Sequence, residues 1–136
     1  MAWWYAGGAP MYVVLASAGL VGLLVVASLA AAIGAWFAPA LRTVARVIGI
    51  GAVFATILPL LVGLVGWWYD RSIVDAAVRA VDPSQAQLIR LAGYSEARHP
   101  MDLGSGLTCA LLVPAAIAGL VALTVPRRGD GGRSAS

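Results

Sequence analysis

Three long runs without a charged side chain constrain this chain more than any other feature of its sequence. The runs extend from Met1 to Leu41, from Val47 to Tyr69 and from Leu103 to Pro126. A helix needs about 20 residues to cross the roughly 30 Å hydrocarbon core of a bilayer, so each run is long enough. The composition agrees, because 61% of the 136 residues are hydrophobic and 11% are charged. We therefore predict an all-α membrane protein with three transmembrane helices.

The predicted spans are residues 11–37, 47–67 and 103–125, inside a membrane domain of residues 11–126. Pro39 ends the first span, since proline cannot continue a helix. Residues 1–10 are predicted to be an interfacial segment, and residues 127–136 a basic, flexible tail. The first run has no basic residue before it and is too long for a cleaved signal peptide, so we expect it to remain in the mature protein.

Arginines set the predicted orientation, because basic residues near span ends are retained in the cytoplasm. The first loop and the tail carry five of them, and the four in the second loop are spread over a longer stretch: Arg42, Arg46, Arg127, Arg128 and Arg133 against Arg71, Arg79, Arg90 and Arg98. We expect the N-terminus outside and the C-terminus in the cytoplasm. Aromatic residues typical of membrane interfaces mark the span ends: Trp3, Trp4, Tyr5, Trp67, Trp68 and Tyr69 at the outer face, and Trp36 and Phe37 at the inner face.

The second loop, residues 70–100, is predicted to be short, extracytoplasmic and helical. From Asp70 to Val81, apolar residues fall on one side of a helix, with an Arg71, Asp75 and Arg79 ladder on the other. Asp82-Pro83-Ser84-Gln85 then has the form of a capping box, so a second helix is expected to begin there and to break near Pro100. Two interpretations are open: a surface that binds a partner or the membrane, and a hairpin packed over its own spans.

Small residues recur at the spacing of helix contacts within the spans. Such residues let helix backbones approach closely in lipid. The predicted packing residues are Ala18, Gly22, Gly51, Ala55, Gly63, Gly66, Gly104, Ala115 and Gly119. Pro59 is predicted to kink the second helix, either to shape a pore or simply as a common feature of membrane helices. Thr56 either lines a pore or bonds its own helix backbone.

Few residues in the chain suggest chemistry. His99 lies near Glu96, Arg98 and Asp102, which indicates either a proton relay or metal site or simply a solvated helix start. Cys109 lies in an apolar run, where cysteine packs as a small hydrophobe. We find no phosphate loop and no nucleophile motif, and the arginines are scattered in ones and twos. We expect no enzyme, no cofactor, no metal and no nucleic-acid partner.

Several segments resemble the MotA/TolQ/ExbB proton-channel family. The resemblance is carried, in the family's order, by Gly7–Leu15, Leu58-Pro59-Leu60-Leu61-Val62-Gly63-Leu64-Val65-Gly66, Gly93-Tyr94-Ser95-Glu96-Ala97 with Gly104 after it, and Leu111–Ala115. Together they cover about a quarter of the chain. The large cytoplasmic region between the family's first two helices is missing, and Trp67 replaces a pore threonine. The chain resembles a reduced, divergent member.

The resemblance implies a small, oligomerising subunit of the bacterial cytoplasmic (inner) membrane. Such a subunit would support transport or envelope work driven by the proton-motive force, together with a single-span ExbD/TolR-like partner. Glu96 matches the family's glutamate, and Asp102, His99 and Thr56 are further candidates for a proton pathway or for partner binding. Two other functions are open: a holin-like protein that forms membrane lesions, and a structural or assembly subunit without conduction.

Overall fold

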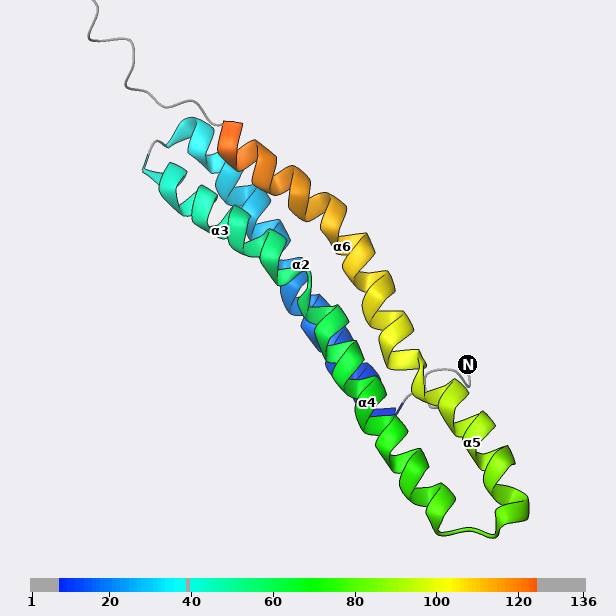
Figure 1. Cartoon of the computed structure of the whole chain (residues 1–136). Helices are drawn as coiled ribbons and strands as arrows, with labels where there is room; N and C mark the ends of the chain where they lie inside the picture. Colours follow the sequence, from blue (N-terminus) through cyan, green and yellow to red (C-terminus); the bar gives the residue numbers. More distant parts are fainter. Residues whose placement is uncertain (1–7, 39, 125–136) are drawn as a thin grey trace, which may run out of the picture.

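The protein is an elongated bundle of α-helices (Figure 1). The computed structural model describes residues 8–38 and 40–124. These residues form five α-helices: α2 (Gly8–Phe37), α3 (Leu41–Ala55), α4 (Leu58–Arg79), α5 (Pro83–Ala97) and α6 (His99–Thr124). The N-terminal segment before Gly8, Pro39 and the predicted tail lie outside the described residues, and so does residue 125 at the end of the third predicted span.

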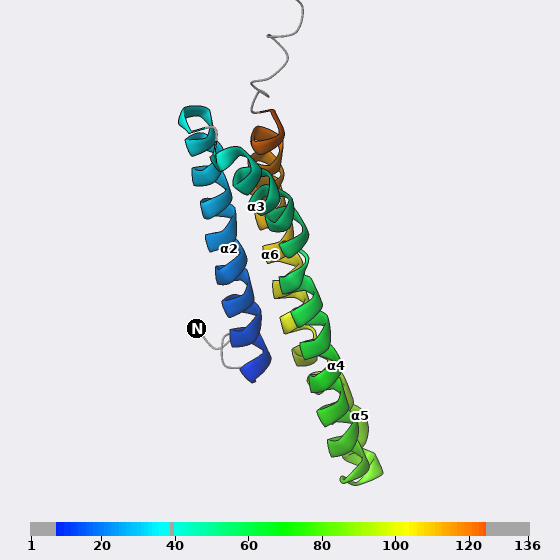
Figure 2. The same ribbon diagram turned by 90° about the vertical axis from the view of Figure 1, so that its left-hand side faces the viewer.

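The five helices are arranged in three lines (Figures 1 and 2). Helix α2 is the first line, α3 and α4 follow one another in the second, and α5 and α6 in the third. Each line contains a stretch long and apolar enough to cross a membrane, in accordance with the three predicted spans. Helix α2 packs against α3, α4 and α6, and α4 packs against both α5 and α6.

Small side chains fill the inside of the bundle, and large side chains lie on its surface. Most buried hydrophobic residues in the described part are alanine or valine, such as Ala32, Ala52 and Ala115, each 0% exposed. Leucine, isoleucine and aromatic side chains point outward along the same helices, as at Leu20, which is 70% exposed. In water this arrangement would leave a large apolar surface uncovered, whereas lipid tails cover it at no cost. The packing therefore supports a location in a membrane.

Glycine and proline bring two helices into direct contact where α4 crosses α6. A β-carbon added at Gly63 would lie 2.5 Å from the carbonyl oxygen of Pro100, and one added at Gly104 would overlap the carbonyl oxygen of Pro59. Gly66 lies against Pro10 of α2 and against Pro100. Each side chain larger than hydrogen is excluded here, so the two backbones touch directly.

The remaining packing residues differ in what they contact. Ala18 and Ala115 are buried, Gly119 lies against Val53, and Gly22 and Ala55 are half-buried. Gly51 does not pack within the chain, because a β-carbon there would have nothing within 4 Å. Gly49 takes the inner position instead, facing Ala122, Gly119 and Ser28. The two glycines are about 200° apart around the helix, so only one of them can face the bundle.

The second line is interrupted between α3 and α4, directly before Pro59. Proline has no N–H group, so the helical hydrogen bond to the carbonyl four residues earlier is missing. Ile57 donates to the carbonyl oxygen of Phe54 at 3.3 Å, three residues back, and the four-residue pattern returns when Leu61 donates to Ile57 at 3.1 Å. Thr56 is 2% exposed and donates its hydroxyl to the Val53 carbonyl oxygen at 2.6 Å. The structure agrees with the second interpretation of Thr56, in which its hydroxyl bonds its own helix backbone.

The predicted separate helix from Asp70 to Val81 is wrong, because α4 runs from the second span to Arg79 without a break. Nothing between Trp67 and Arg79 stops a helix, and extending one costs far less than nucleating a new one. The predicted second helix is confirmed at its start: Pro83 is its first residue, and the carbonyl oxygen of Asp82 accepts the Gln85 N–H at 2.9 Å. The Asp82 side chain, however, makes no capping bond. We call residues 70–97, the end of α4 together with α5, the stalk.

Substituting Gly104 with alanine should destabilise the bundle by about 1–3 kcal/mol, because the added methyl group overlaps the Pro59 carbonyl and forces α4 and α6 apart. Thermal or denaturant unfolding in a mild detergent measures the effect. Gly106→Ala is the matched control on the same helix, since a β-carbon there has nothing within 4 Å. Equal stability of the two variants would contradict the described crossing.

Candidate functional site

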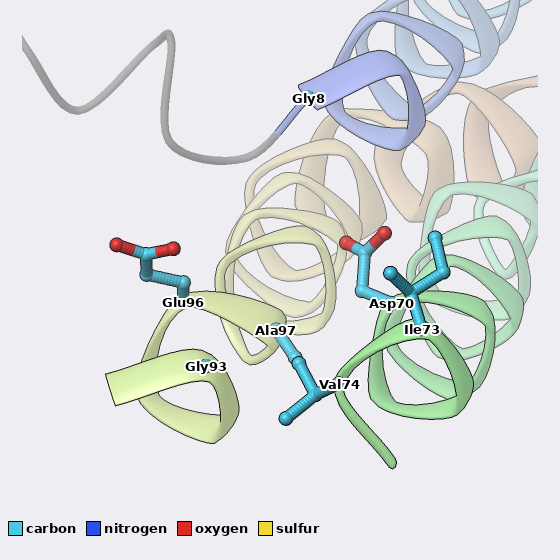
Figure 3. Close-up of a pocket in the computed structure, with 7 residues that line it drawn as sticks. All are labelled: Gly8, Asp70, Ile73, Val74, Gly93, Glu96 and Ala97. Carbon is cyan, nitrogen blue, oxygen red and sulfur yellow. The ribbon is translucent and has the colours of Figure 1, made fainter. Parts of the chain in front are cut away.

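A pocket of about 180 Å³ lies at the base of the stalk, where α2 begins (Figure 3). Helix α4 and the end of α5 form its walls, and the first residue of α2 closes one end. Its lining residues are Gly8, Asp70, Ile73, Val74, Gly93, Glu96 and Ala97. Two of these are acidic and none is basic, so the pocket has a negative rim over an apolar floor.

Asp70 is the less solvated of the two carboxylates. It follows Trp67, Trp68 and Tyr69 in the sequence, just beyond the predicted second span of residues 47–67, and it lines the pocket together with Gly8 (Figure 3). Burial raises the pKa of the Asp70 carboxyl above its usual value. No hydrogen bond or ion pair to Asp70 is found within residues 8–38 and 40–124. The side chain is therefore a partly desolvated charge that nothing in the described part of the chain neutralises.

Glu96 lies on the opposite rim, on α5. Its side chain is exposed, and Figure 3 shows its carboxylate on the far side of the pocket from Asp70. Glu96 is the one predicted site residue that lines this pocket. Asp102 is exposed in the first turn of α6, where a negative charge is favourable, and His99 is half-buried at the start of the same helix.

Aromatic and charged side chains tie the two stalk helices together beside the pocket. The Arg71 guanidinium lies 5.5 Å from the centre of the Trp67 ring and 5.0 Å from that of Tyr94 on α5. The Tyr94 hydroxyl donates a hydrogen bond to Asp75. Cation–π contacts of this kind stabilise by about 0.5–1 kcal/mol each at exposed sites. Arg71 and Asp75 therefore join α4 to α5, whereas the sequence pattern predicted a ladder along α4 alone.

A glycine contact completes the stalk. A β-carbon at Gly93 would lie 2.6 Å from a methyl carbon of Val74, so any larger residue would push α5 away from α4. This contact and the Tyr94 bond fix the level of α5 relative to α4. The sequence pattern predicts neither contact, although Gly93 stands in the segment that resembles the proton-channel family.

A second pocket, which is apolar, lies at mid-span beside the interruption between α3 and α4. It has a volume of about 320 Å³, and its polar side chains are Thr56 and Thr108. The Thr56 hydroxyl already bonds its own backbone, and the Thr108 hydroxyl oxygen is buried without a hydrogen-bond partner among the described residues. Cys109, the next residue, is exposed. Two hydroxyls do not make a continuous polar path across this span.

The described residues hold no group of three or more His, Cys, Asp or Glu side chains able to bind a metal ion. In comparisons with known proteins, no protein family, no curated protein and no solved structure matches the chain.

Replacing Asp70 with asparagine removes the partly desolvated charge and should leave the protein at least as stable near pH 7. Because the folded-state pKa is raised, the wild type gains stability relative to this variant as the pH falls through the folded pKa towards the unfolded one. Unfolding between about pH 7 and about pH 4, in the same detergent, measures the difference. A wild type that loses stability relative to Asp70→Asn on acidification would contradict the assignment.

Proposed function

We propose that the protein is an assembly subunit of the bacterial cytoplasmic membrane that conducts no ions and uses its three-span bundle to hold the stalk at the outer surface. One observation carries the proposal: the spans contain no Asp, Glu, Lys, Arg or His, and glycine and proline bring α4 and α6 into direct contact. Intramembrane charges are the usual mark of an ion pathway. The partly desolvated carboxylate lies instead at the base of the stalk, where another protein can reach it.

The stalk supports an assembly role by its length. The second line, from Leu41 to Arg79, has 39 residues. At about 1.5 Å per residue it is roughly 58 Å long, nearly twice the thickness of the hydrocarbon core. With the span ending near Trp67, the last turns of α4 and all of α5 stand in water. A projecting helical hairpin adds nothing to anchoring, so its role is contact with other chains.

A TolQ/ExbB-like subunit that acts with a single-span partner is the second candidate. The observation that favours it is that Glu96 lines the same pocket as Asp70, on its opposite rim, since the resemblance gives Glu96 the role of a functional carboxylate. Both candidates form homo-oligomers, and both have the N-terminus outside. They differ in whether protons cross the membrane.

Proton flux into liposomes that contain the purified protein separates the two candidates. We expect no flux above that of protein-free liposomes for the wild type or for Glu96→Gln, because the spans lack ionisable groups. Gramicidin added at the end confirms that the vesicles are sealed. A wild-type flux that Glu96→Gln abolishes would overturn the proposed function and establish the second candidate.

Induced expression in a bacterial host tests the holin-like alternative. We expect growth and membrane potential to be maintained, because a tightly packed bundle of small residues offers no polar surface on which a lesion could form. A potential-sensitive dye reports the result, with an induced empty vector as the control. Sudden loss of potential after induction would reject the assembly role in favour of a lesion former.

A further inference from the structure

Among the described residues, no helix covers one side of the stalk where α2 begins. Within the bundle, α2 packs against both α4 and α6, and Pro10 touches Gly66. Beyond Gly8 the same side of the α4–α5 pair has no described helix over it, and the pocket opens there (Figure 3). Ile73 is 51% exposed, and Ala77, one turn further along α4, is also exposed. We call this surface, Asp70, Ile73, Ala77, Gly93 and Glu96, the groove.

The groove is negatively charged although the stalk region as a whole is balanced. Residues 70–98 hold four acidic residues and four arginines: Asp70, Asp75, Asp82 and Glu96, with Arg71, Arg79, Arg90 and Arg98. None of these arginines lines the pocket. Asp70 and Glu96 thus meet no arginine of residues 8–38 and 40–124 in the pocket, so a cationic side chain that docks there together with apolar side chains over Ile73 would be favoured.

The opposite side of α5 has the complementary character. Leu88 is 73% exposed and Leu91 is 66% exposed, although both stand in the part of the chain expected in water. Arg98 follows Leu91 by two helical turns, so it lies on the same face. At about 100° per residue, Arg98 and Glu96 are about 200° apart and point to nearly opposite sides. We call Leu88, Leu91 and Arg98 the ridge.

The groove and the ridge lie at the same height along the stalk, in addition to having complementary charges and apolar residues. Ala97 and Asp70 line one pocket, so the adjacent Arg98 stands near the level of Asp70. Gly93 touches Val74, which places Leu91 and Leu88 at the level of the last turns of α4, beside Ala77. Copies in one membrane share an orientation, so these levels coincide between neighbours.

We propose that the ridge of a second copy of this chain docks in the groove, with Arg98 of the neighbour against Asp70 and Glu96 and its leucines over Ile73 and Ala77. The inference rests on the proposed assembly role and names its partner. Because two different surfaces meet, the contact is heterologous, and repeating it around an axis along the membrane normal closes a ring. One occupant thus covers the exposed leucines and neutralises the carboxylates.

Cysteine pairs test the contact directly. In a Cys109→Ser background, one chain carries Ala77→Cys in the groove and a second, differently tagged chain carries Leu91→Cys on the ridge. Mixed in a bilayer and oxidised, they should form disulfides with each other faster than either forms them with itself. Ser72→Cys in place of Ala77→Cys is the control, because Ser72 is exposed on another face of α4. Equal cross-linking with Ser72→Cys, or none with Ala77→Cys, would overturn the proposal, and self-linked Ala77→Cys chains would indicate a symmetric two-fold contact instead.

A charge exchange tests the role of the ionic pair. Arg98→Glu should weaken self-association about tenfold or more, because it faces two carboxylates, and Glu96→Arg in the same chain should restore it. Arg79→Glu is the matched control with the same change of charge away from the groove. Native mass spectrometry and dilution in detergent measure the association. Loss of association with Arg79→Glu, or no recovery in the double variant, would reject this interface. If oligomers or a retained single-span protein persist while groove variants have no effect, the assembly role stands and only the surface is wrong.

Discussion

The direct contact between the backbones of α4 and α6 is the constraint on which the rest of this protein depends. Lipid tails are as apolar as leucine, so helices in a bilayer are held together by close packing and not by the hydrophobic effect. Pro59 and Gly63 on one helix and Pro100 and Gly104 on the other supply that packing. They also fix the direction in which both helices leave the bundle, and so they determine that α4 and α5 continue together as a stalk.

The side chains that join the helices differ between the bundle and the stalk, as expected for a chain that passes from lipid into water. Inside the bundle, alanines and glycines face the neighbouring helices and large apolar side chains face lipid. In the stalk, Arg71, Asp75 and Tyr94 join the helices, because polar contacts are available where water reaches the chain. Asp70 lies where the two regimes meet, and for that reason it is only partly solvated.

Much of this architecture is readable from the sequence, and the reasons for the failures are physical. The three uncharged runs predicted three helices long enough to span, and Pro83 predicted the start of α5. The length of α4 was missed because an amphipathic pattern looks the same in a new helix and in the continuation of an old one. The spacing predicts Gly51 as a packing residue whereas Gly49 faces inward, because spacing alone does not say which side of a uniformly apolar helix faces the bundle. The sequence does not single out Asp70, because its burial arises only where α2 begins beside α4, a contact between distant parts of the chain.

A hairpin of two helices cannot enclose a core, and this limit decides how the stalk must be understood. In the bilayer, a helix face that no other helix covers is covered by lipid, so α2, α3 and α6 need no further partner. In water the same exposure leaves Leu88, Leu91 and Ile73 in contact with solvent, and exposed apolar surface of this kind marks an interaction site. The partly desolvated Asp70 agrees with this, since its charge has no partner among the described residues and its burial disfavours the charged form. Both costs fall on the stalk, and an apolar, cationic helix that covered it would remove both, which supports the proposed assembly role.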